Sequence, residues 1–162
     1  MRIDDWNRLR KAVRATFLSS YHFAVATVGP DGAPHVAPMG SLLLGEPGHA
    51  IVFQKFIRQT PRNWESDPKV CILGVDSSRW LWLRALFTGR FPTLPAFRLR
   101  GEVVGPPRPA TPEEIRRFRR RLGWLARTRG GDALWGGMAV VRDLRLDEWL
   151  PVQMGSTTRH LA

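Results

Sequence analysis

The feature of this sequence that most constrains its fold is a series of three extended segments separated by two turn sequences. The first segment, residues 21–28, is rich in β-branched and aromatic side chains, and the Gly-Pro-Asp-Gly sequence of residues 29–32 is typical of a tight turn. Residues 35–44 then return antiparallel. A second turn is expected at residues 45–48, and residues 50–54 are too short and too β-prone for a helix. The pattern predicts a three-stranded meander.

A cluster of polar and basic residues follows the third segment, just before a short helix that must end by Asp67-Pro68. A helix start presents unpaired backbone N–H groups and a partial positive charge, so a phosphate group would fit there. The alternative is that Thr60 only caps the helix, with Pro61 at its first position, while the basic side chains face water. The cluster consists of Lys55, Arg58, Gln59, Thr60 and Arg62.

Two motifs occur in order around this helix. The first, residues 26–36, holds the end of one strand, the Gly-Pro-Asp-Gly turn and the start of the next strand. The second, residues 60–70, holds Thr-Pro-Arg-Asn-Trp and then Asp-Pro-Lys-Val. Together they resemble the FMN-binding split-barrel family, which is also called the pyridoxamine 5′-phosphate oxidase-like superfamily. Elsewhere the resemblance is one of topology.

The helix start departs from the usual pattern of that family. The family more often has Ser-x-Lys-x-x-Asn-Leu, whereas this chain has Arg58, Thr60, Asn63 and Trp64 at the corresponding positions. The Thr-x-x-Asn form looks more like the small bacterial FMN-binding proteins than the vitamin B6 oxidase itself. Neighbouring basic residues of the cluster could replace the charge of the missing lysine.

The resemblance implies a mainly β fold, a six-stranded antiparallel split β-barrel of Greek-key type with flanking helices. It implies one FMN-binding domain over residues 1–162. The flanking parts are expected to be an N-terminal helix, an apolar insertion near residues 77–95 and a helix near residues 112–127. The family resemblance also implies a homodimer in which both subunits contribute to each cofactor site.

The resemblance and the chemistry of FMN together suggest binding residues. FMN needs a phosphate clamp, hydrogen bonds to one edge of its isoalloxazine ring and a dry wall against the ring. The predicted clamp is Lys55, Arg58, Gln59 and Thr60, with Arg62 and Asn63 behind them. The resemblance places five residues at the ring edge, where their backbone groups would make most of the contacts: Val36, Ala37, Pro38, Met39 and Gln54. Three residues are candidates for contacts to the cofactor from the partner subunit: Trp80, Trp149 and Gln153. Ordinary packing explains each of them equally well.

Two further segments allow alternative interpretations. The apolar sequence of residues 79–94 could be a helix docked on the barrel, part of a dimer interface, or a flap over the ligand. Thr111 and Glu114 have the spacing of a capping box, at the start of a helical region that Gly130-Gly131 is expected to end. The arginine run at residues 116–121 indicates either a solvated helix face or a surface for a polyanion.

The other elements follow from periodicity. An N-terminal helix is expected, with one of two adjacent aspartates as its cap and apolar residues three and four apart. Further strands are expected at residues 70–75, 96–104 and 138–146, the first of them covered on both faces. Cys71 lies inside that strand and is expected to be a buried, inert thiol.

The formal charge of +11 could suit a nucleic-acid partner, since clustered cations neutralise backbone phosphates. The cations are 22 arginines and 3 lysines spread along the whole chain, which argues against such a partner. No apolar run reaches the ~20 residues that span a bilayer, and the charged first residues are unlike a signal peptide. We therefore expect a cytoplasmic protein without membrane attachment. The four histidines have no metal-ligand spacing, so no metal is expected.

The predicted function is that of an FMN-binding protein, an oxidoreductase that acts as a reductase or oxidase on an unidentified small molecule. No Ser-His-Asp, Cys-His or paired-carboxylate arrangement is evident, so no catalytic residue is assigned. A flavoenzyme needs none of these, because the flavin carries the redox chemistry. The alternatives are a split-barrel protein that binds F420 or haem, and a non-catalytic protein that binds flavin or nucleic acid.

Overall fold

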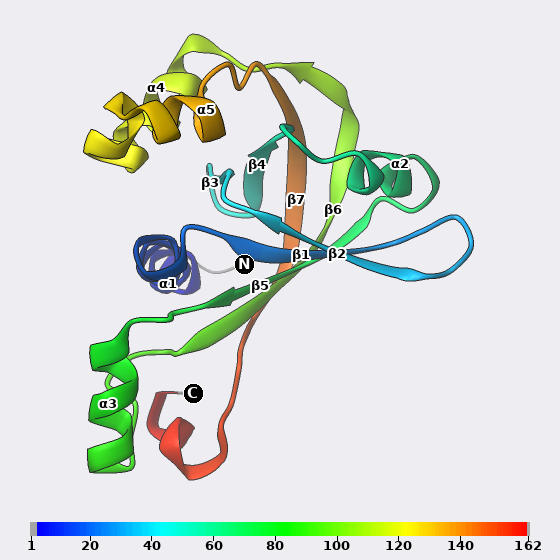
Figure 1. Ribbon diagram of the computed structural model, residues 1–162. Helices are drawn as coiled ribbons and strands as arrows, with labels where there is room; N and C mark the ends of the chain where they lie inside the picture. The colour runs from blue at the N-terminus through cyan, green and yellow to red at the C-terminus, as the bar shows by residue number, and fades with distance from the viewer. Residues whose placement is uncertain (1–2, 162) are drawn as a thin grey trace.

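The computed structural model describes residues 3–161, which form a curled antiparallel sheet with helices packed around it (Figure 1). The strands are β1 (Phe23–Val28), β2 (Pro34–Met39), β3 (Leu42–Leu44), β4 (His49–Phe53), β5 (Lys69–Val75), β6 (Ala96–Pro109) and β7 (Val140–Pro151). The α-helices are α1 (Ile3–Ser20), α2 (Gln59–Ser66), α3 (Arg79–Thr88), α4 (Pro112–Leu122) and α5 (Arg129–Trp135). Short 3₁₀ segments are η1 (Gly123–Arg127), η2 (Gly155–Thr157) and η3 (Arg159–Leu161).

The strands lie in the order β2-β1-β5-β6-β7-β4-β3, with every neighbouring pair antiparallel. The predicted second strand, residues 35–44, is in fact two strands, because β2 pairs with β1 while β3 pairs with β4 at the other end of the order. The chain passes from one end to the other at Gly40, where a Cβ would lie 2.5 Å from the Tyr21 carbonyl oxygen. This crossing curls the sheet. The mainly β, split-barrel prediction is confirmed, with seven strands in the described residues instead of six.

The two longest strands extend beyond their predicted ends. A strand is predicted at residues 96–104, but β6 continues past Gly105, Pro106 and Pro107 to Pro109 and pairs there with the first residues of β7. A register shift between Val104 and Arg108 accommodates the two prolines, which cannot donate to a ladder. A second shift lies at Gly101, where a Cβ would approach the Arg145 carbonyl oxygen to 2.0 Å.

The prediction that the 70–75 strand is covered on both faces is wrong. In β5, Val70 and Ile72 are buried while Leu73 is exposed, the alternation of a strand with one buried face. Cys71 is accordingly only half-buried. Its burial as an inert interior thiol is therefore not observed.

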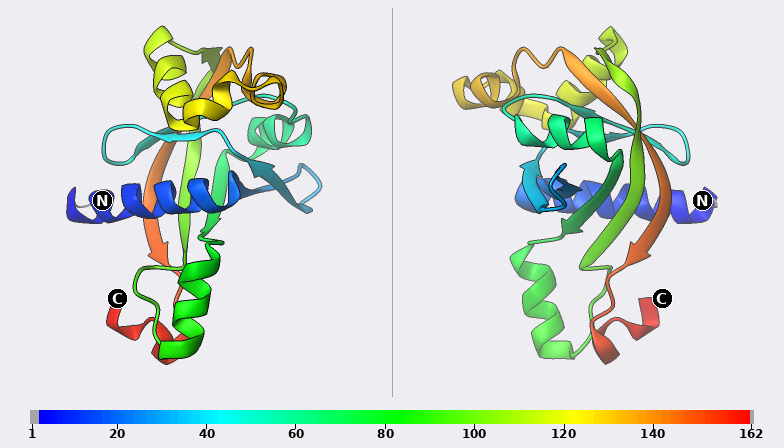
Figure 2. Two further views of the ribbon diagram at one scale, coloured as in Figure 1. Left: turned by 60° about the vertical axis from the view of Figure 1, so that its left-hand side comes forward. Right: turned by 90° about the vertical axis from the view of Figure 1, so that its right-hand side faces the viewer.

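The N-terminal helix α1 supplies one side of the core and runs across the strands (Figure 2). Its residues Trp6, Leu9, Val13 and Phe17 recur at helical spacing, and all four are buried. They pack in one cluster with buried residues of the strands, to which β2 contributes Met39. The two adjacent aspartates, Asp4 and Asp5, lie in the first turn of α1 and not at its cap. Within residues 3–161 no helix is long and apolar enough to cross a membrane.

The helical region after β6 begins as predicted and ends differently. Thr111 accepts a hydrogen bond from the Glu114 backbone N–H at 3.2 Å, and the Glu114 carboxylate accepts one from Thr111 N–H at 2.7 Å. The predicted helix over 112–127 is interrupted after Leu122 by η1, and Gly130-Gly131 lies inside α5. The Thr128 hydroxyl caps α5 by accepting from Gly131 N–H at 2.9 Å, which explains why these glycines start a helix instead of ending one.

The arginine run on α4 has two different faces. Arg116, Arg119 and Arg120 are exposed, as expected for a solvated face. Arg117 and Arg121 instead donate to the carbonyl oxygens of Leu44 and Leu42 on β3. Because β3 ends the strand order, these two arginines occupy carbonyls of a free sheet edge.

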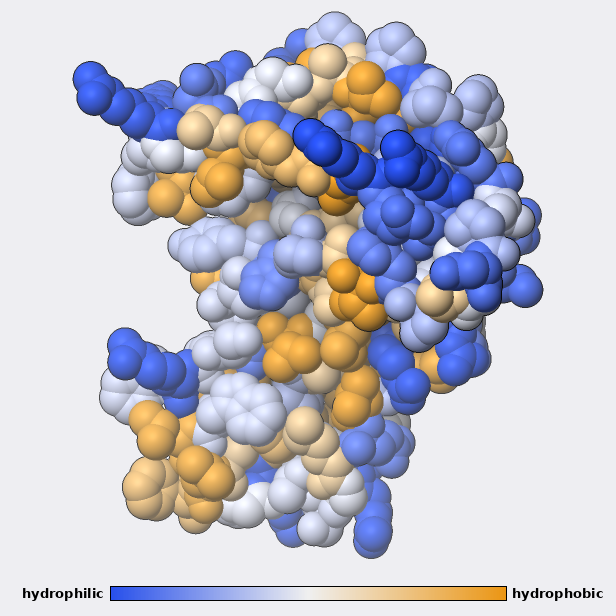
Figure 3. All heavy atoms as spheres, turned by 45° about the vertical axis from the view of Figure 1, so that its right-hand side comes forward, coloured by the Kyte–Doolittle hydropathy of each residue, from blue (hydrophilic) through white to orange (hydrophobic). Residues whose placement is uncertain are grey.

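The apolar insertion forms α3, which projects beyond the end of the sheet (Figure 1). Leu81, Ala85 and Phe91 make a small cluster of their own, against which Leu161 of the C-terminal segment packs. Other apolar side chains of the helix remain exposed, and Figure 3 shows apolar surface gathered at this lower end of the molecule. These exposed side chains are Trp80, Leu83, Leu86 and Phe87.

Arg108 joins β6, β7 and α4 through two carboxylates, Glu114 at 2.7 Å and Asp143 at 2.7 Å. The hydrogen bond from Arg108 lowers the pKa of Glu114 below its ordinary value. A carboxyl group whose pKa is lowered by folding stabilises the protein above its unfolded pKa, and this contribution is lost as the pH falls through the folded value.

We expect Glu114→Gln to reduce the free energy of unfolding by about 1–2 kcal/mol near neutral pH, since it weakens both the capping box and the ion pair. The difference should vanish in acid, because the wild-type carboxyl group is then protonated. Urea unfolding of wild type and Glu114→Gln across the acid range measures this difference in unfolding free energy. Glu113→Gln is the control, since that carboxylate lies one residue away, exposed. Equal stability of wild type and Glu114→Gln at neutral pH would contradict the assignment.

Candidate ligand-binding groove

A groove of about 610 Å³ lies between β2, the loop from β4 to α2, and α5. Its size is within the ~300–1,000 Å³ typical of small-molecule sites. Eight residues predicted from the sequence line it together: Val36, Ala37, Pro38, Met39, Lys55, Arg58, Gln59 and Thr60. Gln54, Arg62 and Asn63 adjoin these residues in the chain, but they are not among the lining residues.

The start of α2 is open at one end of this groove. Its N-cap residue is Arg58, and no side chain of the described residues caps the helix. The interpretation of Thr60 as the cap, followed by Pro61 at the first position, is wrong: they are the second and third residues of α2. The backbone N–H groups at Gln59 and Thr60 therefore begin the helix without a capping oxygen, and the helix dipole adds partial positive charge there.

Two cations accompany this helix start. Arg58 and Arg62 are exposed, and within residues 3–161 neither side chain has an ion pair or hydrogen-bond partner. Guanidinium groups bind phosphate oxygens with charge-assisted hydrogen bonds. Free cations beside an uncapped helix start form a site suited to a phosphate group.

Lys55, a residue of the predicted phosphate clamp, contacts α5. Its Nζ donates to the carbonyl oxygens of Ala133 at 2.9 Å and Gly136 at 2.6 Å, so it binds the C-terminal end of α5. A cation there is also favoured by the helix dipole. Lys55 thus holds α5 against the β4–α2 loop, and two of its three donors are occupied.

Phe56 marks the loop as strained. It has φ 62°, in the left-handed region that a phenylalanine seldom adopts, and its side chain is 75% exposed at the groove. Such a conformation costs about 1–3 kcal/mol and often occurs where a loop is shaped for a ligand. The neighbouring Lys55 ammonium lies 4.8 Å from the Phe56 ring centroid, a cation–π contact that helps to hold the ring.

Asn63 fixes α2 to the sheet. Its Nδ2 donates to Thr27 Oγ1 of β1 at 2.8 Å, and its Oδ1 accepts from Gln59 Nε2 at 2.8 Å. Asn63 is fully buried, so it cannot face a ligand in the groove. It lies behind the helix start, and its amide positions Gln59 at the rim of the groove.

Seven buried side-chain polar atoms of the described residues lack a hydrogen-bond partner, and two of them belong to residues in or next to the groove. Thr60 Oγ1 and Gln54 Nε2 have no hydrogen bond from any described residue. Most buried polar atoms in proteins are paired, with other protein groups or with water or a ligand. Their position, at the start of α2 and at the end of β4, is the position that the resemblance assigns to phosphate and ring-edge contacts. The residues present therefore fit an FMN-like ligand.

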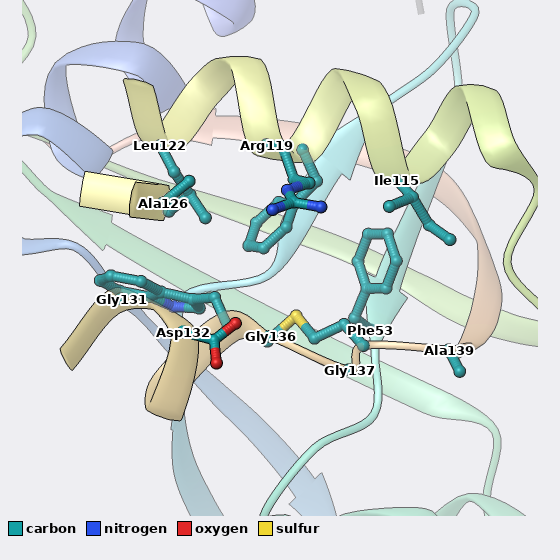
Figure 4. A pocket seen from close by; sticks show the side chains of 13 residues that line it. Phe53, Ile115, Arg119, Leu122, Ala126, Gly131, Asp132, Gly136, Gly137 and Ala139 are labelled. Atoms are coloured by element: carbon teal, nitrogen blue, oxygen red, sulfur yellow. The ribbon is translucent and has the colours of Figure 1, made fainter. Parts of the chain in front are cut away.

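The wall formed by α5 was not predicted. Leu134, Trp135 and Met138 line the groove beside Phe56 and Ile57. A second cavity of about 250 Å³ lies under α4 and α5 and shares Phe53, Trp135 and Met138 with the groove. Figure 4 shows Arg119 and Leu122 of α4 facing α5, with Asp132 on the opposite side. The apolar residues near Trp135 were the sequence signal for this wall. It was missed because Gly130-Gly131 was expected to end the helical region.

The residues expected from a partner subunit lie away from the groove. Trp80 on α3 is 82% exposed, Gln153 is exposed after β7, and Trp149 on β7 is partly buried with the Arg8 guanidinium 5.4 Å from its ring centroid. None of the three is among the lining residues. Their contribution from a second subunit remains a prediction.

His35 at the groove is a residue that the sequence interpretation omitted. It is half-buried on β2 and is the one imidazole among the lining residues, which include no carboxylate. Within residues 3–161 no group of three or more His, Cys, Asp or Glu side chains is placed to hold a metal ion. The groove thus offers cations, one imidazole and apolar walls.

Comparison with known proteins connects this geometry to a family. The protein-family model described as pyridoxamine 5′-phosphate oxidase matches residues 9–134. No curated protein matches the sequence significantly.

Several solved structures share the fold. An FMN-binding protein from Syntrophomonas wolfei subsp. wolfei is 16% identical, with a TM-score of 0.59 over 94% of this chain and 90% of that one. HupZ from Group A Streptococcus is 17% identical, with a TM-score of 0.56 over 91% and 96% of the two chains. A structure described as an F420 reductase is 20% identical, with a TM-score of 0.51 over 79% and 87%. At these identities the similarity shows the fold alone.

Proposed function

Because this chain belongs to the pyridoxamine 5′-phosphate oxidase family, we propose that it binds FMN in the groove between β2, the β4–α2 loop and α5. One observation carries the proposal. The uncapped start of α2 opens at one end of a groove whose other walls are largely apolar; the unpaired Arg58 lines this groove, and the unpaired Arg62 is the fourth residue of α2. A phosphate joined to a flat aromatic ring system has this combination of charge and apolar surface.

The proposed pose follows from the walls. The phosphate would take hydrogen bonds from the start of α2 and from Arg58 and Arg62, and the ring would lie toward Trp135 and Met138. Backbone groups of β2 would supply contacts at the ring edge. Lys55 would act indirectly, by holding α5 in place as a wall.

We also propose that the protein is an oxidoreductase acting on a small molecule. Bound FMN supplies hydride and electron transfer. The chain's own part would be to bind and orient the ligand, to exclude water with apolar walls, and to move protons. The His35 imidazole, which lines the groove, offers a hydrogen-bond donor and an acceptor toward a bound ligand.

We propose further that two chains build each site. A monomer would leave Trp80, Leu86 and Phe87 in water, although large apolar side chains gathered on one surface usually mark an interface. Figure 3 shows a hollow between the α3 end of the molecule and its upper part, where a second chain could fit. Light scattering of the FMN-bound protein should give twice the chain mass, and a monomer with full FMN occupancy would contradict a shared site.

The test of the proposed function is the identity of the bound small molecule. We expect the purified protein to carry FMN, or to take up about one FMN per chain when it is added, as measured by the absorption spectrum and the mass of the released ligand. F420 and haem are the comparison ligands, each with a distinct spectrum. Saturation by either of them, without binding of FMN, would overturn the proposal.

A further inference from the structure

A second groove, of about 420 Å³, lies between α1 and α4 over β3. It has no lining residue in common with the first groove among those described. Its cationic side chains come from both helices: Arg10, Arg14, Arg117, Arg120 and Arg121. No carboxylate of the described residues lines it. Five arginines around one hollow without a lining counter-ion repel one another, so the groove favours an anion.

The deepest cation is Arg121. Its guanidinium carbon lies 4.0 Å from the Phe17 ring centroid and 5.7 Å from that of Phe23, and one nitrogen donates to the Leu42 carbonyl oxygen. Its second terminal nitrogen, Nη2, is buried and has no partner within residues 3–161. Burial lowers the pKa of Arg121 to about 10. A buried guanidinium with an unused donor is costly without an anion to accept from it.

The other arginines of the groove differ in whether their guanidinium groups already have partners. Arg117 donates to the Leu44 carbonyl oxygen at 2.8 Å, and Arg10 donates to that of Gly45 at 2.5 Å. Arg14 is exposed and has no partner among the described residues. Arg120 has only a distant, solvent-exposed ion pair with Glu113 at 3.6 Å. Arg14 and Arg120 therefore remain free to close on a ligand from opposite helices.

The floor of this groove is apolar. It is formed by Val13 and Phe17 of α1 and by Leu43 and Leu44 of β3, which are at most 8% exposed. Leu18 is 58% exposed beside the groove. An extended phosphate backbone would contact the arginines but leave Leu18 in water, so the exposed Leu18 favours a ligand with an apolar part.

We propose that the groove between α1 and α4 binds an amphipathic carboxylate, such as a medium-chain fatty acid. The head group lies between Arg14 and Arg120, with the buried guanidinium of Arg121 behind them, and the apolar part covers Leu18. The carboxylate can accept from two guanidinium groups at once. The site is independent of the proposed FMN groove, and neither function requires the other.

Decanoate is the probe, titrated into the full-length protein and followed by calorimetry. We expect saturable binding of about one decanoate per chain, with decanol much weaker because it lacks the charge. Arg14→Gln with Arg120→Gln should weaken decanoate binding by about tenfold or more, since both cations that close on the head group are lost. Flavin content should not change.

The matched control is Arg116→Gln with Arg119→Gln. These arginines lie on the same α4 helix and carry the same charge, but they do not line this groove. Decanoate affinity should stay within about twofold of wild type in this control. Equal weakening by the two double variants would show a general effect of net charge and overturn the proposal. So would equal affinity for decanol, or an absence of saturable decanoate binding.

Discussion

Replacing Arg58 and Arg62 together by glutamate is expected to weaken FMN binding by about 100-fold or more while leaving the fold intact. Charge-assisted hydrogen bonds contribute about 1.5–3 kcal/mol each, so the loss of two such contacts alone accounts for 100-fold. The new carboxylates would also repel the phosphate at the start of α2. Fluorescence titration with FMN measures the change.

The fold should tolerate this double replacement, because both side chains are exposed and neither has a partner in the part of the chain that the structure describes. Lys11→Glu with Arg127→Glu is the matched control, with the same change in net charge at exposed residues outside the groove. It should change FMN affinity only slightly. If the two double variants lose affinity equally, the phosphate is attracted by overall charge and not by the α2 site.

Asn63→Leu is expected to cost about 3 kcal/mol of unfolding free energy, the largest effect on stability that we predict at the site. The replacement removes the donor to Thr27 and the acceptor of Gln59, and it leaves the Thr27 hydroxyl buried and unpaired. For a chain of this size the melting temperature should fall by about 6–12 °C. FMN affinity should also fall, because α2 loses the bond that orients it against β1.

A double-mutant cycle with Thr27→Val separates the hydrogen bond from simple packing. Thr27→Val removes the buried hydroxyl that Asn63→Leu would leave unpaired, so the two replacements together should cost less than the sum of the single costs. Additive costs in thermal or urea unfolding would mean that the Asn63–Thr27 hydrogen bond does not hold α2. A loss of less than about 0.5 kcal/mol in Asn63→Leu alone would lead to the same conclusion.

Local chemistry allowed much of the barrel to be predicted. The Gly-Pro-Asp-Gly turn forms as expected: Gly32 has φ 79°, and the Asp31 carboxylate accepts from Ala33 N–H at 3.0 Å. The Thr111 capping box also forms as its spacing indicates. Both depend on residues within four positions of one another, where the sequence alone contains the necessary information.

What the sequence did not reveal depends on distant partners. The end of β6 is set by its pairing with β7, and this pairing carries the strand past two prolines. The wall at α5 is held by Lys55, about 80 residues away in sequence. Likewise, Arg117 and Arg121 resemble solvated charges until α4 is placed over the free edge of β3.

The candidate site, too, was predictable where its residues are neighbours in the chain and not where distant packing decides. Residues that lie next to one another in the chain, from Lys55 to Thr60, were identified together and do line one groove. The exact start of α2 was not, because Thr60 is buried against the fold instead of capping the helix. Capping preference is worth about 1 kcal/mol, and packing of a whole helix against a sheet exceeds it.

The most direct test of the account is a comparison of FMN with riboflavin, which has the same ring and lacks the phosphate. If the start of α2 and its two free arginines bind the phosphate, FMN should bind at least about 100-fold more tightly than riboflavin. This preference should be lost when Arg58 and Arg62 are both replaced by glutamate. Equal affinity for the two flavins in the wild-type protein would contradict the central claim.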